Sequence, residues 1–213
     1  GHMPDYLLSG IPLARLDALA FRDLGVMIDT SLSFSHHAQT IVSKARSVMA
    51  IILRSFVSKN PHVLFKAFKA YVRPIVEYGS PVWNVFGNEP KIAKSIERVQ
   101  RYFTMRVFCR AGLKKLNYSR RLKFLGELSL SKRRKIADLC FIHAVLKNRQ
   151  YCPAVALMPS NLSRPSTRLV TDAIPRGPRK NFLPNRVDQH WYKLPSRITA
   201  LSAKAFRSNV GYM

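Results

Sequence analysis

Residues 91–108 read KIAKSIERVQRYFTMRVF, and this stretch decides the fold class. Its apolar residues recur at steps of three and four, the spacing of one face of an α-helix. They are Ile92, Ile96, Val99, Phe103 and Val107. The cations Lys94, Arg98 and Arg101 fall on a separate stripe, so this helix is expected to bury one face and to present a basic one.

The region before this helix carries a similar pattern from residue 41 to residue 56. The apolar positions there also recur at steps of three and four residues, and Ser33 or Ser35 stands where a helix N-cap is expected. A helix that runs to about Val57 is therefore predicted.

A second helix is predicted to start at Asn60-Pro61, where a capping residue is followed by a first-turn proline. Pro74 lies inside its apolar pattern and should kink or end the helix near Val72, because proline removes a backbone hydrogen bond. Gly87–Pro90 then predicts a turn before the helix quoted above.

The N-terminal region is expected to be extended. Residues 1–3 resemble a cloning remnant and are left out of the reasoning. Tyr6–Leu13 and Leu19–Ile28 are two short segments with glycine and proline as punctuation, so a β-hairpin is predicted within residues 4–30.

Beyond residue 110, a short helical piece is predicted at Ser119–Leu125, followed by a break at Gly126 and a helix from about Ser131 to Leu146. The periodicity is lost from Tyr151 to Pro184. Two short helices are expected near the end, at 182–191 and 202–210.

The sequence thus predicts a mainly α protein. It combines a β-hairpin over 4–30, a helical bundle over 31–110, a basic helical extension over 111–150 and a loop-rich C-terminal extension with short helices over 151–213.

The composition points to a polyanionic partner. The 213 residues carry a formal net charge of +25, more than solubility requires. Residues 91–149 hold 17 basic and 3 acidic side chains, so most of the excess lies there. No segment approaches the roughly 18 consecutive apolar residues of a membrane-spanning helix.

Neither catalysis nor a bound metal or cofactor is predicted. The acidic residues are scattered, and the sequence contains no GxSxG, HExxH or P-loop motif. His36-His37 has no cysteine or acidic partner at ligand spacing. The three cysteines form no CxxC pair, which favours reduced thiols in an intracellular protein of the nucleus or cytoplasm.

Two basic stripes are candidate phosphate contacts. Lys66, Lys69 and Arg73 share one helical face, as do Lys94, Arg98 and Arg101. A single triad of this kind is more often a solvated surface. Here almost no acidic residue lies between the cations, which favours binding.

The sharpest local signal is the run Lys132, Arg133, Arg134 and Lys135 in the first turn of a predicted helix. Cations there oppose the positive end of the helix dipole, so an anion such as a phosphate is expected at this position. A nuclear-localisation patch or an exposed, frayed turn is the alternative. Further cations just upstream would join the same patch; they are Arg120, Arg121 and Lys123.

Three aromatic residues, Tyr71, Trp83 and Tyr102, have the chemistry to stack on bases or sugars. Each lies at apolar helix spacing or beside a proline break, so core packing is favoured for all three.

Several segments, in this order, resemble the region after the catalytic palm in non-LTR (LINE-type) retrotransposon reverse transcriptases, especially jockey-like ones. The resemblance covers most of residues 6–149 and is weaker in the tail, at Phe182, Arg186 and 191–195 (WYKLP). The segments are 21–29 (FRDLGVMID), 31–34 (SLSF), 71–84 (YVRPIVEYGSPVWN), 96–104 (IERVQRYFT) and 118–126 (YSRRLKFLG).

The resemblance implies that the N-terminal hairpin is similar to a primer grip, and that the helices from Phe34 to Phe108 are similar to the thumb that closes on template and primer. The fingers and the palm with its paired aspartates are not in this sequence, so polymerase activity is not expected of this chain by itself. The implied partners are RNA or an RNA–DNA hybrid, bound through the backbone, and the fingers and palm of the same polyprotein.

Two other classes remain open. One is a protein-interaction module, including a domesticated retroelement fragment that docks on a palm domain or on an acidic host protein. The other is peripheral membrane binding through a basic amphipathic helix. Substitution of the cations from Lys132 to Lys135 is expected to separate nucleic-acid binding from docking through an apolar face.

Overall fold

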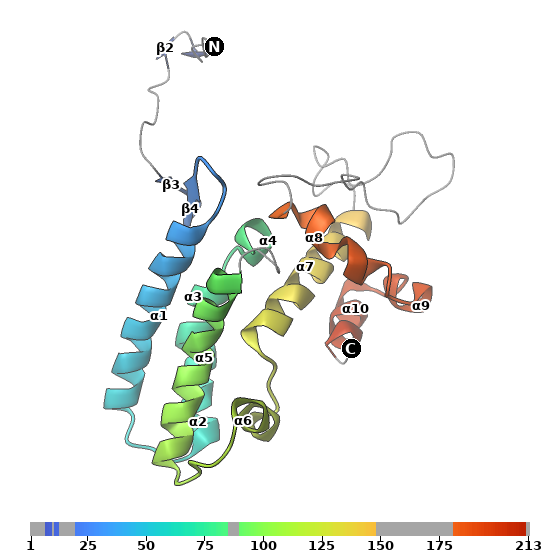
Figure 1. Cartoon of the computed structure of the whole chain (residues 1–213). Helices are drawn as coiled ribbons and strands as arrows, with labels where there is room; N and C mark the ends of the chain where they lie inside the picture. The colour runs from blue at the N-terminus through green and yellow to red at the C-terminus, as the bar shows by residue number, and fades with distance from the viewer. Residues whose placement is uncertain (1–6, 10, 13–19, 85–89, 148–180, 212–213) are drawn as a thin grey trace.

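The structure is a computed structural model that describes residues 7–9, 11–12, 20–84, 90–147 and 181–211. The protein is mainly α, as predicted, with short antiparallel hairpins at the N-terminus (Figure 1). The described helices are α1 (Ser35–Ser55), α2 (Pro61–Ala67), α3 (Arg73–Glu77), α4 (Ser80–Trp83), α5 (Pro90–Arg110), α6 (Tyr118–Leu125), α7 (Leu130–Lys147), α8 (Leu183–Trp191), α9 (Ser196–Thr199) and α10 (Ala203–Val210).

Helix α5 is the centre of the main core, and it lies beside α1 for much of its length (Figure 1). The apolar stripe predicted for it is buried throughout, with Phe103 fully inaccessible. Phe103 contacts Phe68 of the neighbouring helical segment, with a ring-centroid distance of 4.9 Å. The periodicity of residues 91–108 therefore identified the core-facing side of the helix correctly.

The segment that contains Pro74 changes its helical winding as predicted, but the chain continues. The Asn60 side chain accepts a hydrogen bond from the His62 amide at 2.9 Å and caps α2. After α2 comes one π-helical turn, η1 (Phe68–Val72), and α3 follows directly. A π turn re-routes the backbone hydrogen bonds around the position where proline has no N–H, so the helix passes Pro74 with a local change in winding.

The N-terminal strands pair differently from the prediction. A hairpin is present, but the two expected segments do not pair with each other. Strand β1 (Leu7–Leu8) pairs with β2 (Ile11–Pro12), and β3 (Ala20–Asp23) pairs with β4 (Val26–Asp29). Each predicted segment contained its own turn, and a local pairing closes a shorter loop.

The turn that leads into α1 is held by Asp29. Neither Ser33 nor Ser35 is the N-cap that the sequence predicted, because Phe34 occupies that position in a left-handed conformation without a side-chain cap. The Asp29 carboxylate instead accepts hydrogen bonds from the amides of Ser33 at 3.0 Å and Phe34 at 3.1 Å. Asp29 thus joins the end of the β3–β4 hairpin to the start of α1.

The C-terminal helices pack on α7. Leu139 and Ile142 of α7 form a second apolar cluster with residues of α8, α9 and α10, including Trp191 and Phe206. Both short helices predicted near the end of the chain are present as α8 and α10. Most of the predicted loop from Tyr151 to Pro184 and most of the turn at Gly87–Pro90 lie outside the described residues.

A buried ion pair connects α7 and α8. The Arg186 Nε donates to an Asp138 oxygen at 3.1 Å, and both side chains are almost inaccessible to solvent. The Asn84 amide donates to the same Asp138 oxygen at 2.9 Å, which adds the end of α4 to the network.

None of the described helices combines the length and apolarity that crossing a membrane requires.

Candidate nucleic-acid interface

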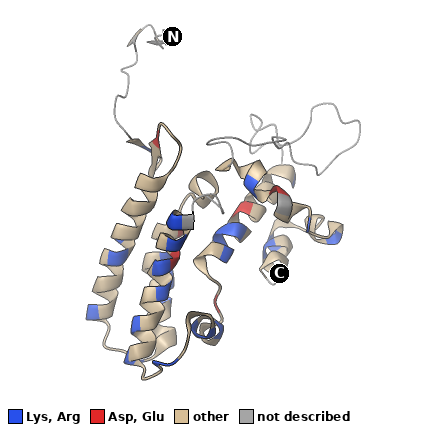
Figure 2. Ribbon diagram, viewed as in Figure 1, with Lys and Arg blue, Asp and Glu red and all other residues tan. Residues whose placement is uncertain are grey.

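Several of the few acidic residues of this chain form ion pairs inside the fold. Glu77 binds Arg133, Glu127 binds two cations of the α2–α3 segment, and Asp138 binds Arg186. Glu97 and Asp29 accept backbone amides. The exposed cations are therefore left without nearby carboxylates over large parts of the described surface, as Figure 2 shows by the blue segments along the helices.

The first predicted stripe does not form a free basic surface. Lys69 lies 3.0 Å and Arg73 lies 2.8 Å from the Glu127 carboxylate. Arg73 is also largely buried, with its guanidinium 5.6 Å from the centre of the Phe65 ring. Of the three cations in this stripe, only Lys66 is exposed without an ion pair in the described structure. The sequence did not reveal Glu127 as the partner of Lys69 and Arg73, because it is remote from them along the chain.

The second predicted stripe is on the surface. Lys94, Arg98 and Arg101 are all exposed on the solvent face of α5. The guanidinium of Arg101 lies 4.8 Å from the centre of the Tyr118 ring, a distance typical of a cation–π contact. None of the three forms an ion pair within the part of the chain that the structure describes.

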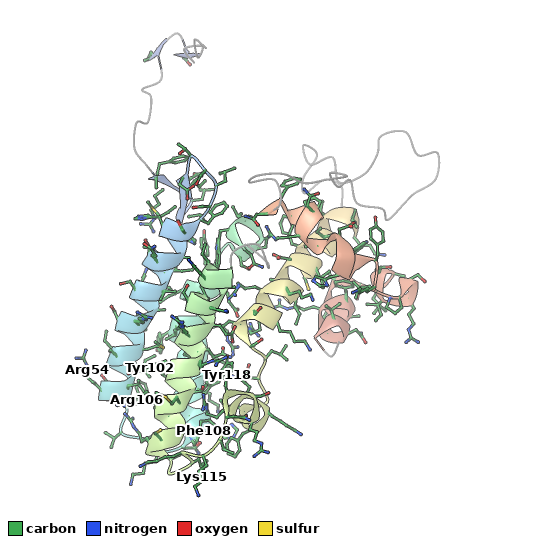
Figure 3. All side chains as sticks on the ribbon, in the orientation of Figure 1. Arg54, Tyr102, Arg106, Phe108, Lys115 and Tyr118 are labelled. Carbon is green, nitrogen blue, oxygen red and sulfur yellow. The ribbon has the colours of Figure 1, made fainter. Side chains whose placement is uncertain are left out.

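A groove of about 610 Å³ runs along α1 and α5 beside this stripe. We call it the α1–α5 groove. Arg46 of α1 and Arg98 and Arg101 of α5 line it together with Tyr102, and the groove is otherwise lined by apolar groups such as Met49. In Figure 3, Tyr102 and Arg106 lie on the side of α5 next to α1, and Arg54 marks the lower part of α1.

The patch predicted around α6 is divided between surface and interior. Arg120 and Lys123 are exposed. Arg121 is buried, contrary to its assignment as a binding residue, and it donates to the Leu116 carbonyl at 2.7 Å and to the Thr104 hydroxyl at 3.2 Å. Burial lowers the pKa of the Arg121 guanidinium, and the neighbouring Arg101 contributes to the shift.

The four cations from Lys132 to Lys135 likewise lie in different environments, because an α-helix turns successive residues by about 100°. Arg133 forms two hydrogen bonds with the Glu77 carboxylate, which raise the pKa of its guanidinium. Arg134 is only 2% exposed, and its Nε donates to Asn84 at 3.3 Å. Both were predicted to bind an external anion, but Arg134 is buried and Arg133, whose side chain is 27% exposed, is paired with Glu77. Lys132 and Lys135 are partly exposed and form no ion pair within the described residues.

An anion does lie at the start of α7, but it is Glu97. The Glu97 carboxylate accepts hydrogen bonds from the amide of Ser131 at 2.8 Å and from the amide of Leu130 at 3.3 Å. It also accepts from the Tyr118 hydroxyl, and burial together with this bond raises the pKa of Tyr118. The expectation that a bound phosphate satisfies these amides is therefore wrong.

The three aromatic residues considered for stacking on bases or sugars differ in their exposure to solvent. Trp83 is buried, as favoured, and its indole N–H donates to the Tyr78 carbonyl at 2.6 Å. Tyr71 and Tyr102 were expected in the core, but they are 61% and 50% exposed. Both fall near the edge of an apolar stripe, where spacing alone does not decide between core and surface.

The sequence reasoning missed two contributors to the basic surfaces. Arg46 was overlooked because only the apolar face of its helix was considered, although Arg46 follows the buried Ala45 by one residue. Lys193 lies near Lys135 across the α7–α8 contact, and no periodicity in the sequence links two residues so far apart. In the described residues, no three His, Cys, Asp or Glu side chains converge as metal ligands would.

The chain is similar to a protein of a nematode worm. The chain is 26% identical over 145 residues to an uncharacterized protein of Caenorhabditis elegans, and the match covers 68% of this chain and 72% of that protein. No family model and no solved structure matches the chain. That protein has no described function, so the basic surfaces are the basis for a functional proposal.

Proposed function

We propose that this protein binds the backbone of RNA or of an RNA–DNA duplex, without sequence preference, through the α1–α5 groove. The observation that carries the proposal is the convergence of Arg46, Arg98 and Arg101 from two helices with no ion pair among the described residues. Cations held without carboxylate partners attract phosphates and release the counterions condensed on a nucleic acid.

The dimensions of this surface suit a nucleic-acid strand. Lys94 and Arg101 are seven residues apart on one helix, about 10 Å along its axis. One strand of a duplex places a phosphate about every 3.4 Å of axis, so the row spans several phosphates. Tyr102 adds a half-exposed ring between the cations, and such rings stack on sugars and bases without selecting a sequence.

The resemblance to non-LTR reverse transcriptases gives the proposal its context. In that reading the helices from α1 to α5 act as a thumb that holds template and primer, and the β3–β4 hairpin is similar to the primer grip. The polymerase reaction would then belong to fingers and palm outside this sequence. The protein itself contributes position and charge to that reaction, not catalytic groups.

A second candidate is an acidic protein partner that docks in the same groove. The mixture of cations with Ala50, Leu53 and the 39%-exposed Met105 favours it, because an apolar floor contributes little to phosphate binding. Such a partner would need apolar side chains to cover the floor. A nucleic-acid duplex would gain little binding energy from Leu53 and Met105.

Charge-removal variants test the proposal directly. The triple variant Arg46→Met, Arg98→Met and Arg101→Met is compared with a control that removes three exposed lysines elsewhere, Lys114, Lys115 and Lys204. Fluorescence anisotropy with a labelled RNA–DNA hybrid should show at least about tenfold weaker binding for the groove variant than for the control. Equal losses in both would refute a localized site.

The apolar floor distinguishes the two candidates. Met105→Ser leaves the net charge unchanged and alters a groove residue that is exposed to solvent. If a nucleic acid occupies the groove, hybrid binding should change by less than about twofold, since phosphate contacts dominate the affinity. Hybrid binding too weak to measure in wild-type protein would favour the acidic protein partner.

A further inference from the structure

A second basic site lies on α7, on a different face from Arg133 and Arg134. Lys132 and Lys135 of α7 and Lys193, just after α8, line a pocket of about 500 Å³, and His190 lies beside them. Ile136, Leu139, Leu194 and Val210 are among the remaining lining residues. We call it the lysine pocket. No aspartate or glutamate is among its described lining residues.

Lys132 and Lys193 place two further positive charges beside Lys135. Burial lowers the pKa of the Lys135 amine, and the charges of Lys193 and Lys132 lower it further. Burial also lowers the pKa of His190, with Lys135 and Lys193 as the charged neighbours. Like charges brought together by two separate elements are relieved when an anion binds between them.

The amides at the start of α7 do not provide this anion site, because Glu97 already accepts two of them. Recognition in the lysine pocket must therefore come from side chains. Ammonium groups act as compact point charges for phosphate oxygens, and three of them match the two charges of a terminal phosphate better than the single charge of a phosphodiester.

The pocket has room for more than a phosphate. Its volume falls in the range of roughly 300–1,000 Å³ typical of small-molecule sites. Ile136 and Leu194, which are partly exposed, provide apolar surface close to the cations, which suits the organic part of an ester. We propose that the lysine pocket binds a phosphomonoester, specifically the 5′-phosphate of a nucleotide, with the nucleoside on the apolar floor.

Calorimetric titration of the full chain tests this inference with three probes. Adenosine 5′-monophosphate should bind more tightly than inorganic phosphate, and adenosine should not bind detectably. In the double variant Lys135→Met and Lys193→Met, binding of the nucleotide should fall by at least about tenfold, because two charged contacts are lost. The control Lys114→Met and Lys115→Met should change it by less than about twofold.

The double variant removes the repulsion between Lys135 and Lys193, so its thermal stability should equal or exceed that of the wild type. A loss of nucleotide binding would then not result from unfolding. An equal fall in both variants, or no measurable binding of the nucleotide to wild-type protein, would overturn the inference. The lysine pocket shares no lining residue with the α1–α5 groove, so the triple groove variant should still bind adenosine 5′-monophosphate normally.

The source of the phosphomonoester can then be identified. Single-stranded oligonucleotides with a 5′-phosphate and with a 5′-hydroxyl are compared on wild-type protein and on the Lys135→Met, Lys193→Met variant. If the 5′-phosphate strengthens binding about tenfold only in the wild type, the pocket holds a strand end. If the two oligonucleotides bind alike while the mononucleotide binds, the ligand is a free nucleotide.

Discussion

The Glu97 carboxylate of α5 accepts a hydrogen bond from the Ser131 amide at the start of α7, with an oxygen–nitrogen distance of 2.8 Å. This bond joins the central helix to the helix on which the C-terminal cluster packs. It also places a negative charge at the positive end of the α7 dipole, where four consecutive cations would otherwise be unfavourable. The interaction is internal and needs no ligand.

Removal of this carboxylate should destabilise the fold. Glu97→Gln keeps one oxygen but loses the charge, and a loss of about 1–2 kcal/mol in the free energy of unfolding is expected. Urea denaturation measures it. Asp23→Asn, at an exposed carboxylate, is the matched control for the rise in net charge. If the two variants lose equal stability, Glu97 does not act as a cap.

Asp29 should make stability depend on pH in the acid range. Burial raises its pKa, but hydrogen bonds from Ser31, Ser33 and Phe34 outweigh this effect, and the pKa lies below the usual value of 3.8. A carboxyl whose pKa is lowered on folding stabilises the fold above the unfolded pKa. That contribution disappears as the pH falls through the lower, folded pKa.

The variant Asp29→Asn should therefore lose about 1 kcal/mol at pH 7, and the difference from wild type should shrink below about pH 4. Urea denaturation at pH 7, 5 and 3 measures this. A difference that stays constant across the range would show that the charge of Asp29 has no role in holding the turn before α1.

The buried pair of Asp138 and Arg186 should hold the C-terminal helices on α7. Arg186→Met leaves a buried carboxylate without its main partner, so a loss of about 3 kcal/mol or more is expected. Hydrogen exchange should speed up in α8 and α10. Asp138→Asn added to Arg186→Met removes the orphaned charge and should recover part of the loss, whereas Arg197→Met, on the surface of α9, should have little effect.

Neighbouring cations in the first turn of α7 should have opposite roles. Arg133→Met removes both hydrogen bonds to Glu77 and should lower stability by about 1–2 kcal/mol. Lys132→Met should change stability by less than about 0.5 kcal/mol, because it is partly exposed and has no ion pair in the described structure. Thermal melts that show equal losses for the two variants would contradict the internal role of Arg133.

Much of the fold was predictable because its signals are local. The stripe from Ile92 to Val107, the cap at Asn60 and the irregularity at Pro74 each depend on residues within a few turns of one another. The pairing of the N-terminal strands was predicted incorrectly because β propensity marks extended segments but not their partners.

The candidate site was less predictable because charge pairing is not local. The sequence shows Lys69, Arg73 and Arg133 as free cations, and only the fold brings Glu127 and Glu77 to them. Helical turn geometry could have separated Arg133 and Arg134 from Lys132 and Lys135, since adjacent residues face different directions. Nothing local indicated that Arg46 would line a groove with Arg98.

The salt dependence of binding tests the central claim most directly. The logarithm of the affinity for an RNA–DNA hybrid is measured against the logarithm of the salt concentration for the wild type and for the Arg46→Met, Arg98→Met, Arg101→Met variant. Each lost phosphate contact should reduce the slope by about 1, so a reduction of about 3 is predicted. Equal slopes for the two proteins would contradict phosphate binding in the α1–α5 groove.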